Sequence, residues 1–469
     1  MSIIDPEIPV AATSHPLSSP SQIDDILNRF AHFGIELGLE RIERLLARLG
    51  NPHRQYPILH VAGSNGKGSV CAYLSSVLTE AGYRVGRYTS PHLIDWGERI
   101  CLNGHPIAPV DLYDALQHVV AVIEPDQPSP TQFEVITAAA WLYFAQQQVD
   151  IAVIEVGLGG RLDATNVCDR PLVSIITSLS REHWQRLGPT LADIAREKAG
   201  ILKPNCPAIV GPLPSEAEAV VRQRIADLDC PAFWITPSLD LGDGWALYQG
   251  VEAAGSTVKV LLDSTPLKYP LPLPGAHQLS NSALAIATFQ LLRQAGWQIS
   301  DTAIVAGMAK TQWVGRLQWT TWEGRSLLID GAHNPAGAAA LRRYVDTSDR
   351  ISQPLHWVMG MLSTKDHAEV FQELLRPGDR LYLVPVPDHA SANLDEMVAL
   401  ARRVCPELGG CYISSDVLAG VRSAFRDTQG MEPLPVTVLC GSLYLIGYFF
   451  KLTQRDLSRS SNENLANRV

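Results

Sequence analysis

The sequence predicts an α/β protein of two domains, each built on a mainly parallel β-sheet. Short apolar runs alternate with helical stretches from about residue 55 to 210, as they do where crossover helices connect parallel strands. The same alternation starts again near Arg316. Because 469 residues exceed what one core usually holds, the two stretches indicate two domains, which we expect at residues 21–315 and 316–455.

The elements of the first domain follow from local patterns. The run at 151–156 is apolar and β-branched, which is typical of a strand covered on both faces. A helix is predicted at 69–81, where Val70, Leu74 and Val77 share one face and Gly82 ends the pattern. The stretch at 133–144 is apolar on nearly all sides, as in a buried helix. Further strands are expected at 56–61, 84–89, 173–177 and 208–210.

The rest of the chain divides in the same way. Residues 230–275 are rich in Gly and Pro, and we expect an elaboration at the sheet edge with a strand at 257–262, followed by a helix at 281–294. Residues 1–20 and 456–469 are polar without periodicity, so we expect mobile tails. The second domain is predicted to contain helices at 335–344 and 367–375 and strands at 327–330, 356–359, 380–384 and 436–440.

Composition excludes several classes of protein. With 46% hydrophobic and 18% charged residues the chain is not largely disordered, and a net charge of −10 argues against a nucleic-acid partner. Eight cysteines without a CxxC pair favour core thiols over disulfides or a zinc site. No apolar run is long enough to span a membrane and the N-terminus lacks a signal-peptide pattern, so we expect a cytoplasmic protein without a membrane partner.

The segment 60–69, HVAGSNGKGS, stands between a predicted strand and a predicted helix. A glycine-rich turn at this place directs backbone N–H groups and a helix N-terminus toward phosphate oxygens, and Lys67 adds a positive charge. The segment departs from GxxxxGK[ST], because Gly63 lies four residues before Lys67 and the hydroxyl is displaced to Ser69. We interpret it as a variant phosphate loop; the alternative is a plain glycine turn.

Polar residues at other strand ends add to this prediction. Glu155 ends the strand at 151–156, where open α/β sheets bind ligands, and suits a magnesium ion; the alternative is an ion pair with Arg161. Ser90 follows the strand at 84–89, and we expect it within reach of the same ion; the alternative is a plain Ser-Pro turn. Asp330 and His333 follow a strand of the second domain directly before a helix.

These motifs, in this order, resemble the folylpolyglutamate synthase and dihydrofolate synthase family, within the wider Mur-ligase-like group. The departures are mild: Ser64 stands for the usual Thr, Glu182 for Asp and Val314 for Pro. Matching segments extend from about residue 25 to 450. They include LGNP (49–52), GRYTSPHL (86–93), TQFEVITAAA (131–140), VIEVGLGGRLDATNV (153–167), REHWQRLG (181–188), IAREKAGILK (194–203), IDGAHNP (329–335), KD (365–366) and GSLYLIG (441–447).

The resemblance implies a Mur-ligase-like fold, with an N-terminal P-loop ATPase domain and a smaller C-terminal Rossmann-like α/β domain. It implies one Mg²⁺ at Ser90 and Glu155 and a second at His183, and it leaves room for a monovalent cation and a carboxylated Lys198. Phe133, Arg161 and Asp163 are implied substrate contacts; the alternative for Phe133 is a place in the core. The implied catalytic residues are Lys67, Glu155, His183, Lys198 and His333. The implied nucleotide-binding residues are Gly63, Ser64, Asn65, Gly66, Lys67, Gly68, Ser69, Asn281, Arg316, Asp330 and His333.

The implied activity is an ATP-dependent amide ligation of folate biosynthesis and one-carbon metabolism. L-glutamate is joined to dihydropteroate, to the glutamate tail of tetrahydrofolates, or to both, through an acyl phosphate, with ADP and phosphate as products. GLGGRLDATN resembles the bacterial bifunctional members, and a monomer is the family-like expectation. The alternatives are a Mur-type ligase that adds amino acids to a cell-wall precursor and an ATP-binding switch protein.

Overall fold

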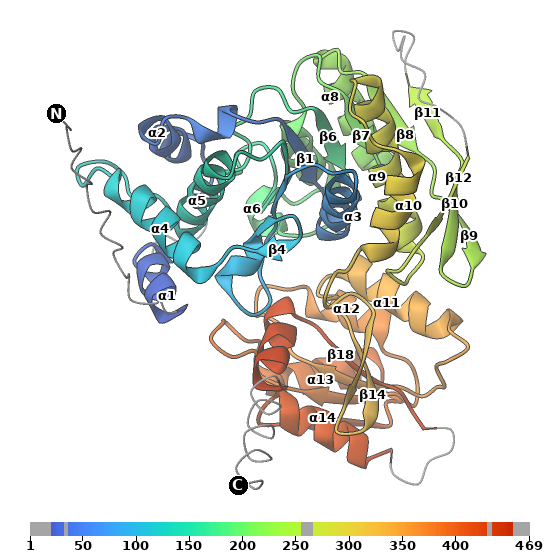
Figure 1. Ribbon diagram of the computed structural model, residues 1–469. Coiled ribbons are helices and arrows are strands. Elements are labelled where there is room, and N and C mark those ends of the chain that lie inside the picture. The colour runs from blue at the N-terminus through green and yellow to red at the C-terminus, as the bar shows by residue number, and fades with distance from the viewer. Residues whose placement is uncertain (1–19, 32–35, 255–265, 429–433, 454–469) are drawn as a thin grey trace, which may run out of the picture.

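The computed structural model describes residues 20–31, 36–254, 266–428 and 434–453. The strand expected at 257–262 and nearly all of both expected tails lie outside these ranges. Two α/β domains are confirmed, and each has its own sheet (Figure 1). The expected boundary at 315 and 316 stays a prediction.

The first sheet contains, among the described residues, β1 (Ile58–Ala62), β2 (Val85–Tyr88), β3 (Ile100–Leu102), β4 (His105–Pro106), β5 (Ile151–Glu155), β6 (Val173–Ile176), β7 (Ala208–Val210), β8 (Ala232–Ile235) and β11 (Val251–Ala254). Their order is β11-β8-β7-β6-β1-β5-β2-β3-β4. The strands from β8 to β2 are parallel, and β11, β3 and β4 pair antiparallel at the two edges. The strands expected at 56–61, 84–89, 151–156, 173–177 and 208–210 are confirmed, with ends that differ by at most two residues.

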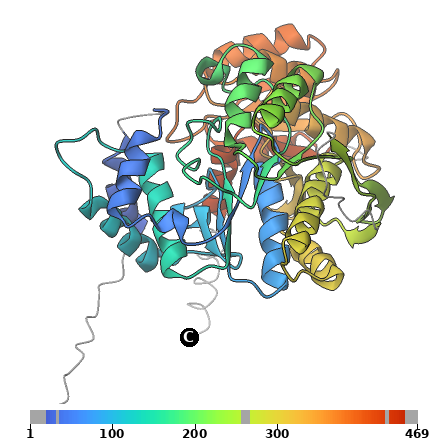
Figure 2. The same cartoon turned by 90° about the horizontal axis from the view of Figure 1, so that it is seen from above.

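Helices cover both faces of this sheet, which is why its central strands are buried on both sides. They are α1 (Pro20–Asn28), α2 (Glu40–Arg48), α3 (Lys67–Glu80), α4 (Pro109–Ala121), α5 (Gln132–Gln146), α6 (Trp184–Leu187), α7 (Leu191–Lys198), α8 (Ser215–Asp227), α9 (His277–Gln294) and α10 (Asp301–Lys310). Leu59 and Val61 pack with α3 and α9, whereas Ile58 packs on the opposite face with α5. Figure 2 shows α1, α2, α4 and α5 grouped apart from α3, α9 and α10.

The described parts of the region 230–275 are more regular than the composition indicates. β8 joins the main sheet, and β9 (Leu239–Gly242), β10 (Trp245–Tyr248) and β12 (Leu267–Pro270) form a separate antiparallel sheet. These strands have four residues each, which is too short for an alternating pattern to stand out. The helix predicted at 281–294 also begins earlier, at His277.

The second domain has a six-stranded sheet in the order β13-β14-β18-β15-β16-β17. Its strands are β13 (Gln318–Trp322), β14 (Arg325–Ile329), β15 (His356–Met359), β16 (Arg380–Leu383), β17 (Gly410–Ile413) and β18 (Thr437–Cys440). Among the described residues of this sheet, β13 pairs antiparallel and the other strands pair parallel. The helices are α11 (Pro335–Thr347), α12 (His367–Leu374), α13 (Leu394–Val404), α14 (Val417–Arg426) and one at 443–453.

The two sheets direct their carboxyl ends toward each other. The residues after β1 and β5 and those after β14 line one cavity between the domains. Because ligands of open α/β sheets bind beyond the carboxyl ends of parallel strands, this arrangement places the candidate site at the junction. None of the described helices is long and apolar enough to cross a membrane.

Candidate active site

The loop between β1 and α3 takes a conformation that requires its glycines. Gly63 has φ of 152° and Gly66 has φ of 89°. A Cβ atom on Gly63 would lie 1.9 Å from Oγ1 of Thr177, and one on Gly66 would lie 2.4 Å from Oδ1 of Asn281. The hydroxyl of Thr177 also donates to the carbonyl of Asn65 at 2.6 Å. The loop therefore lies against the end of β6 and the first turns of α9.

Two lysines converge on this loop. Nζ of Lys67 and Nζ of Lys198 each lie 2.9 Å from the carbonyl oxygen of Gly63. Lys198 is 2% exposed and also donates to Glu182 at 2.9 Å. Burial disfavours the Glu182 carboxylate, but the ammonium groups of Lys198 and Lys67 outweigh it and lower the pKa of Glu182 to about 2. Glu182 is therefore ionised and paired with Lys198.

Glu155 is buried at the end of β5 and faces this positive charge. Burial raises the pKa of Glu155, and the nearby Lys67 opposes that rise. The backbone N–H of Ser90 donates to the Glu155 carboxylate at 3.2 Å, so the two predicted ligands of one magnesium ion do meet. The alternative pairing with Arg161 is not present, because that guanidinium binds Glu197 at 2.8 Å.

The second domain contributes the residues that follow β14. The carboxylate of Asp330 accepts from the N–H groups of Leu317 at 2.9 Å and Ala332 at 2.8 Å. Nδ1 of His333 lies 2.8 Å from the carbonyl of Gly331, so it carries the proton and Nε2 remains an acceptor. Burial, aided by Lys365, lowers the pKa of His333 to about 3, which keeps the ring neutral.

An amide pair connects the phosphate loop to the second domain. Nδ2 of Asn334 donates to Oδ1 of Asn65 at 3.1 Å, and Nδ2 of Asn65 donates back to Oδ1 of Asn334 at 3.4 Å. Asn334 also begins α11, where its side chain accepts from the N–H of Gly337. One residue thus caps a helix of the second domain and contacts the loop of the first.

A cavity of about 330 Å³ collects most of the predicted nucleotide and metal residues. Gly63 is the exception and lies just outside its lining. The lining residues include Ser64, Asn65, Gly66, Lys67, Gly68, Ser69, Ser90, Glu155, His183, Lys198, Asn281, Arg316, Asp330 and His333.

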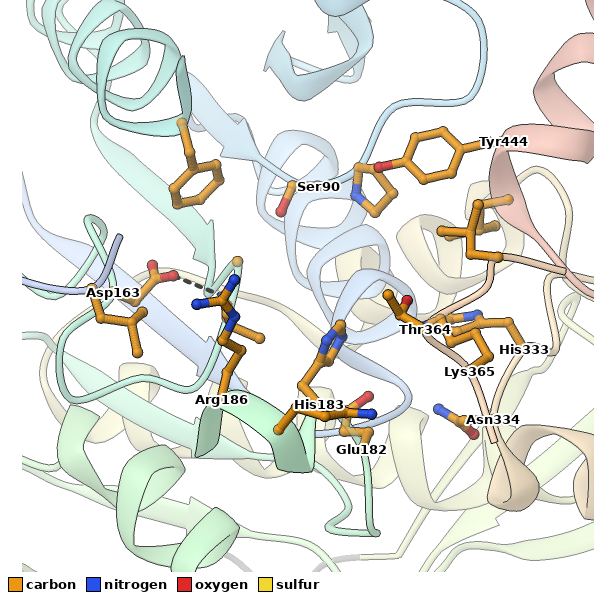
Figure 3. Close-up of a pocket in the computed structure, with 18 of the residues that line it drawn as sticks. Ser90, Asp163, Glu182, His183, Arg186, His333, Asn334, Thr364, Lys365 and Tyr444 are labelled. Atoms are coloured by element: carbon orange, nitrogen blue, oxygen red, sulfur yellow. Dashed lines mark hydrogen bonds between the residues drawn. The ribbon is translucent and has the colours of Figure 1, made fainter. Parts of the chain in front are cut away.

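A larger cavity of about 780 Å³ adjoins the first and shares Ser90, His183 and His333 with it (Figure 3). Of the predicted substrate contacts, Phe133 and Asp163 line this cavity. Arg161 lines neither cavity, because its half-exposed side chain is held by Glu197.

The two substrate candidates in this cavity also have structural contacts. Asp163 is buried, and its carboxylate accepts from the N–H of Leu158 at 2.8 Å and the hydroxyl of Thr165 at 2.6 Å. Phe133 packs over Gly157, where a Cβ atom would lie 2.4 Å from the ring. These contacts hold Asp163 and Phe133 in place in the cavity wall.

The described residues do not include a group of three or more His, Cys, Asp or Glu side chains placed to hold a metal ion. Mg²⁺ in nucleotide sites commonly uses one or two protein carboxylates and takes its other ligands from phosphates and water. Glu155 with Ser90, beside a phosphate loop, fits that pattern. His183 lines the same cavity from the start of α6.

Several cavity residues were not predicted as site residues from the sequence. Glu182, Arg186 and Lys365 lie in segments that match the family, but the resemblance assigns none of them a role in the site. Asn334 was part of IDGAHNP, and its position before a Pro at the helix start was the available signal. For Arg186 no local pattern exists, since its importance depends on what surrounds it in space.

Comparison with known proteins agrees with this arrangement. Residues 61–289 match the family model of the Mur ligase middle domain, and residues 316–452 match that of the dihydrofolate synthetase C-terminal domain. The dihydrofolate synthase/folylpolyglutamate synthase of Bacillus subtilis is 38% identical over 315 residues, which cover 66% of this chain and 72% of the relative. The protein of the same description from Escherichia coli is 33% identical over 431 residues and 92% and 94% of the two chains.

Solved structures extend the likeness to the whole arrangement. Mycobacterium tuberculosis folylpolyglutamate synthase, complexed with ADP and AMPPCP, matches with a TM-score of 0.79 at 29% identity, covering 92% of this chain and 97% of the other. Escherichia coli FolC in complex with DHPP and ADP matches with a TM-score of 0.75 at 29% identity, covering 94% and 99%. The chain therefore belongs to the folylpolyglutamate synthase and dihydrofolate synthase family.

Proposed function

We propose that this chain is an ATP-dependent ligase that joins the amine of L-glutamate to a carboxylate of a pteroyl substrate. The acceptor is dihydropteroate, the glutamate tail of a tetrahydrofolate, or both. One observation carries the proposal: the phosphate loop and Glu155 face Asp330 and His333 across one cavity, next to a larger cavity for a second substrate. Family membership supplies the substrate class, and relatives complexed with ADP support the use of ATP.

The chemistry explains why such a site needs ATP. A carboxylate is a poor electrophile, because attack by an amine would have to displace oxide from an anionic group. Transfer of the γ-phosphoryl group to a carboxylate oxygen gives an acyl phosphate and ADP. The amine of glutamate then adds to the acyl carbon, loses a proton, and phosphate leaves with the former carboxylate oxygen. Catalysis of this transfer rests mostly on positioning and charge neutralisation.

We assign the protein groups accordingly. Lys67 and the backbone amides of residues 64–69 bind the β- and γ-phosphates. The ammonium group of Lys67 donates to the backbone carbonyl oxygens of Gly63 and Ser64, and a phosphate oxygen would be a further acceptor for it. Asn281 and Arg316 contact the nucleotide from the domain junction. Asp330 and His333 reach it from the second domain.

We assign one Mg²⁺ to Ser90 and Glu155 and a second to His183 and a carboxylated Lys198. Magnesium, when bound, neutralises phosphate charge and aligns the reacting oxygens. Burial lowers the pKa of Lys198, which favours the neutral amine that carboxylation needs, while the pairing with Glu182 opposes it. We also include a monovalent cation among the cofactors of the site.

We assign Phe133 and Asp163 to the pteroyl substrate. Both belong to the larger cavity, on the side of the first domain. The aromatic face of Phe133 suits stacking with a flat heterocycle. Arg161 is left out of this set because of its position outside both cavities. A cytoplasmic monomer is our expectation for the working protein.

The test is product analysis with each acceptor. The purified chain is incubated with ATP, Mg²⁺ and glutamate, together with dihydropteroate in one reaction and tetrahydrofolate in another, and the products are resolved by mass. We expect an acceptor heavier by one or more glutamates, with one ADP and one phosphate per amide bond. ATP hydrolysis that is independent of both substrates would indicate a switch protein, and a phosphorylated product without glutamate a kinase. Either result contradicts the proposal.

A further inference from the structure

The acidic side chains that line the larger cavity are all engaged. Each already has a hydrogen-bond or ion-pair partner from the protein. The pairs are Glu36 with Arg41, Glu134 with Arg41, Asp163 with the N–H of Leu158, Glu182 with Lys198, and Asp366 with the indole of Trp184.

The basic side chains of the same cavity divide into two groups. Arg99 donates to His92 at 2.9 Å, and Arg181 pairs with Glu369 at 3.3 Å. Arg186 and Lys365 line the cavity without any acceptor for their charged groups among the residues that the structure describes. Asp163 and Asp366 accept only from uncharged donors, whereas Arg186 and Lys365 are the two cations of this cavity whose charged groups remain available to an anionic substrate.

The two cations occupy different parts of the cavity. Lys365 lies near His333 and Asn334, beside the phosphate loop, whereas Arg186 lies toward Asp163 (Figure 3). Arg186 belongs to α6, and its backbone N–H donates to the carbonyl of His183 at 2.9 Å. In the view of Figure 3, Arg186 lies between Asp163 and His183.

We propose that Arg186 binds the α-carboxylate of a glutamate that is already attached to the pteroyl substrate. The inference rests on the proposed function. Dihydropteroate has a single carboxylate, which is the one that reacts. A folate has two on its glutamate, and only the γ-carboxylate reacts. With the pteroyl group at Phe133 and Asp163, and the γ-carboxylate at the wall that both cavities share, the α-carboxylate lies between them, where Arg186 lines the larger cavity.

Arg186 is therefore a specificity residue that favours folates carrying a glutamate tail over dihydropteroate. A guanidinium suits this role because its fork of N–H groups matches a carboxylate in a bidentate manner. Arg186 is not needed for phosphoryl transfer itself, which uses the other cavity.

The test compares Arg186→Gln with the wild-type chain on two acceptors, dihydropteroate and tetrahydrofolate, at saturating ATP and glutamate. We expect KM for tetrahydrofolate to rise about tenfold or more, because a charge-assisted pair is lost, and KM for dihydropteroate to stay within about twofold. Arg186→Lys keeps the charge but not the fork, so it should restore part of the affinity. Thermal unfolding of each variant checks that the fold is kept.

Arg196→Gln is the matched control. Arg196 lies on α7, is largely exposed, and pairs with Asp193 away from both cavities. It should behave as the wild type with both acceptors.

Three results would overturn the assignment: equal rises in KM for both acceptors, no change for either, or a wild-type chain that uses dihydropteroate alone. The last result would leave the ligase function standing. A wild-type chain that forms an amide with neither acceptor would instead contradict the proposed function.

Discussion

Lys67 and Lys198 share one acceptor, the carbonyl oxygen of Gly63, in a chain whose net charge is −10. The carboxylate of Glu182 neutralises the positive charge of Lys198 through an ion pair. The hydrogen bonds of Lys67 go only to the carbonyls of Gly63 and Ser64 among the described residues. An acidic protein that binds phosphates has to concentrate positive charge locally, and at the scale of single residues Lys67 is where that charge is free to act.

Replacement of Lys67 tests this assignment. Lys67→Ala should reduce kcat/KM for the ligation by at least about 100-fold, because a charge aimed at the transferring phosphoryl group is lost. The thermal unfolding midpoint should change little, since no ion pair is broken. Lys310→Ala is the control: that lysine is exposed, pairs with Glu80 at 2.6 Å and is remote from both cavities. Wild-type turnover by Lys67→Ala would refute the phosphate-loop interpretation.

At the scale of elements, the sequence was most informative where strands end. Val61, Glu155 and Asp330 lie at or next to such ends, and the structure brings the segments that follow these strands to one cavity. Capping residues offer a similar local signal. Thr131 and Glu134 form a capping box at the start of α5, which aims Phe133 into the larger cavity. Local interactions of this kind can be recognised from the sequence alone.

Other features of the same elements have no local signal. The four-residue strands β9 and β10 pair only because a small sheet forms around them. The sequence around Arg161 and Arg186 does not show which of the two has an ion-pair partner. In the structure, Arg161 pairs with Glu197, whereas the guanidinium of Arg186 lines a cavity without an acceptor among the described residues. Which cation is paired depends on contacts between distant segments, and no spacing rule predicts it.

At the scale of the whole molecule, the site is complete only when both domains contribute. The amide pair of Asn65 and Asn334 joins the phosphate loop to α11, and Trp184 donates to Asp366 of the second domain at 3.3 Å. These contacts hold the two walls of the cavity together. Closure of this kind would keep water from an acyl phosphate.

The substitution Asn334→Ser removes the hydrogen bonds to Asn65 but keeps a residue that can cap α11. Serine caps a helix about as well as asparagine, so the free energy of unfolding should change by less than about 0.5 kcal/mol. The hydrogen bonds to Asn65 are lost, and KM for ATP should rise roughly five- to tenfold. Asn393→Ser changes the equivalent cap of α13, which makes no such contact, and should leave KM unchanged. An unaltered KM in Asn334→Ser would show that the amide pair does not position the loop.

The central claim is that this junction activates a carboxylate as an acyl phosphate, and oxygen transfer tests it most directly. Dihydropteroate, or tetrahydrofolate if that is the acceptor used, is labelled with ¹⁸O in the reacting carboxylate and incubated with the wild-type chain, ATP and glutamate. The account predicts one ¹⁸O in the inorganic phosphate for each amide formed, because the bridging oxygen leaves with phosphorus. Amide product accompanied by unlabelled phosphate would contradict it.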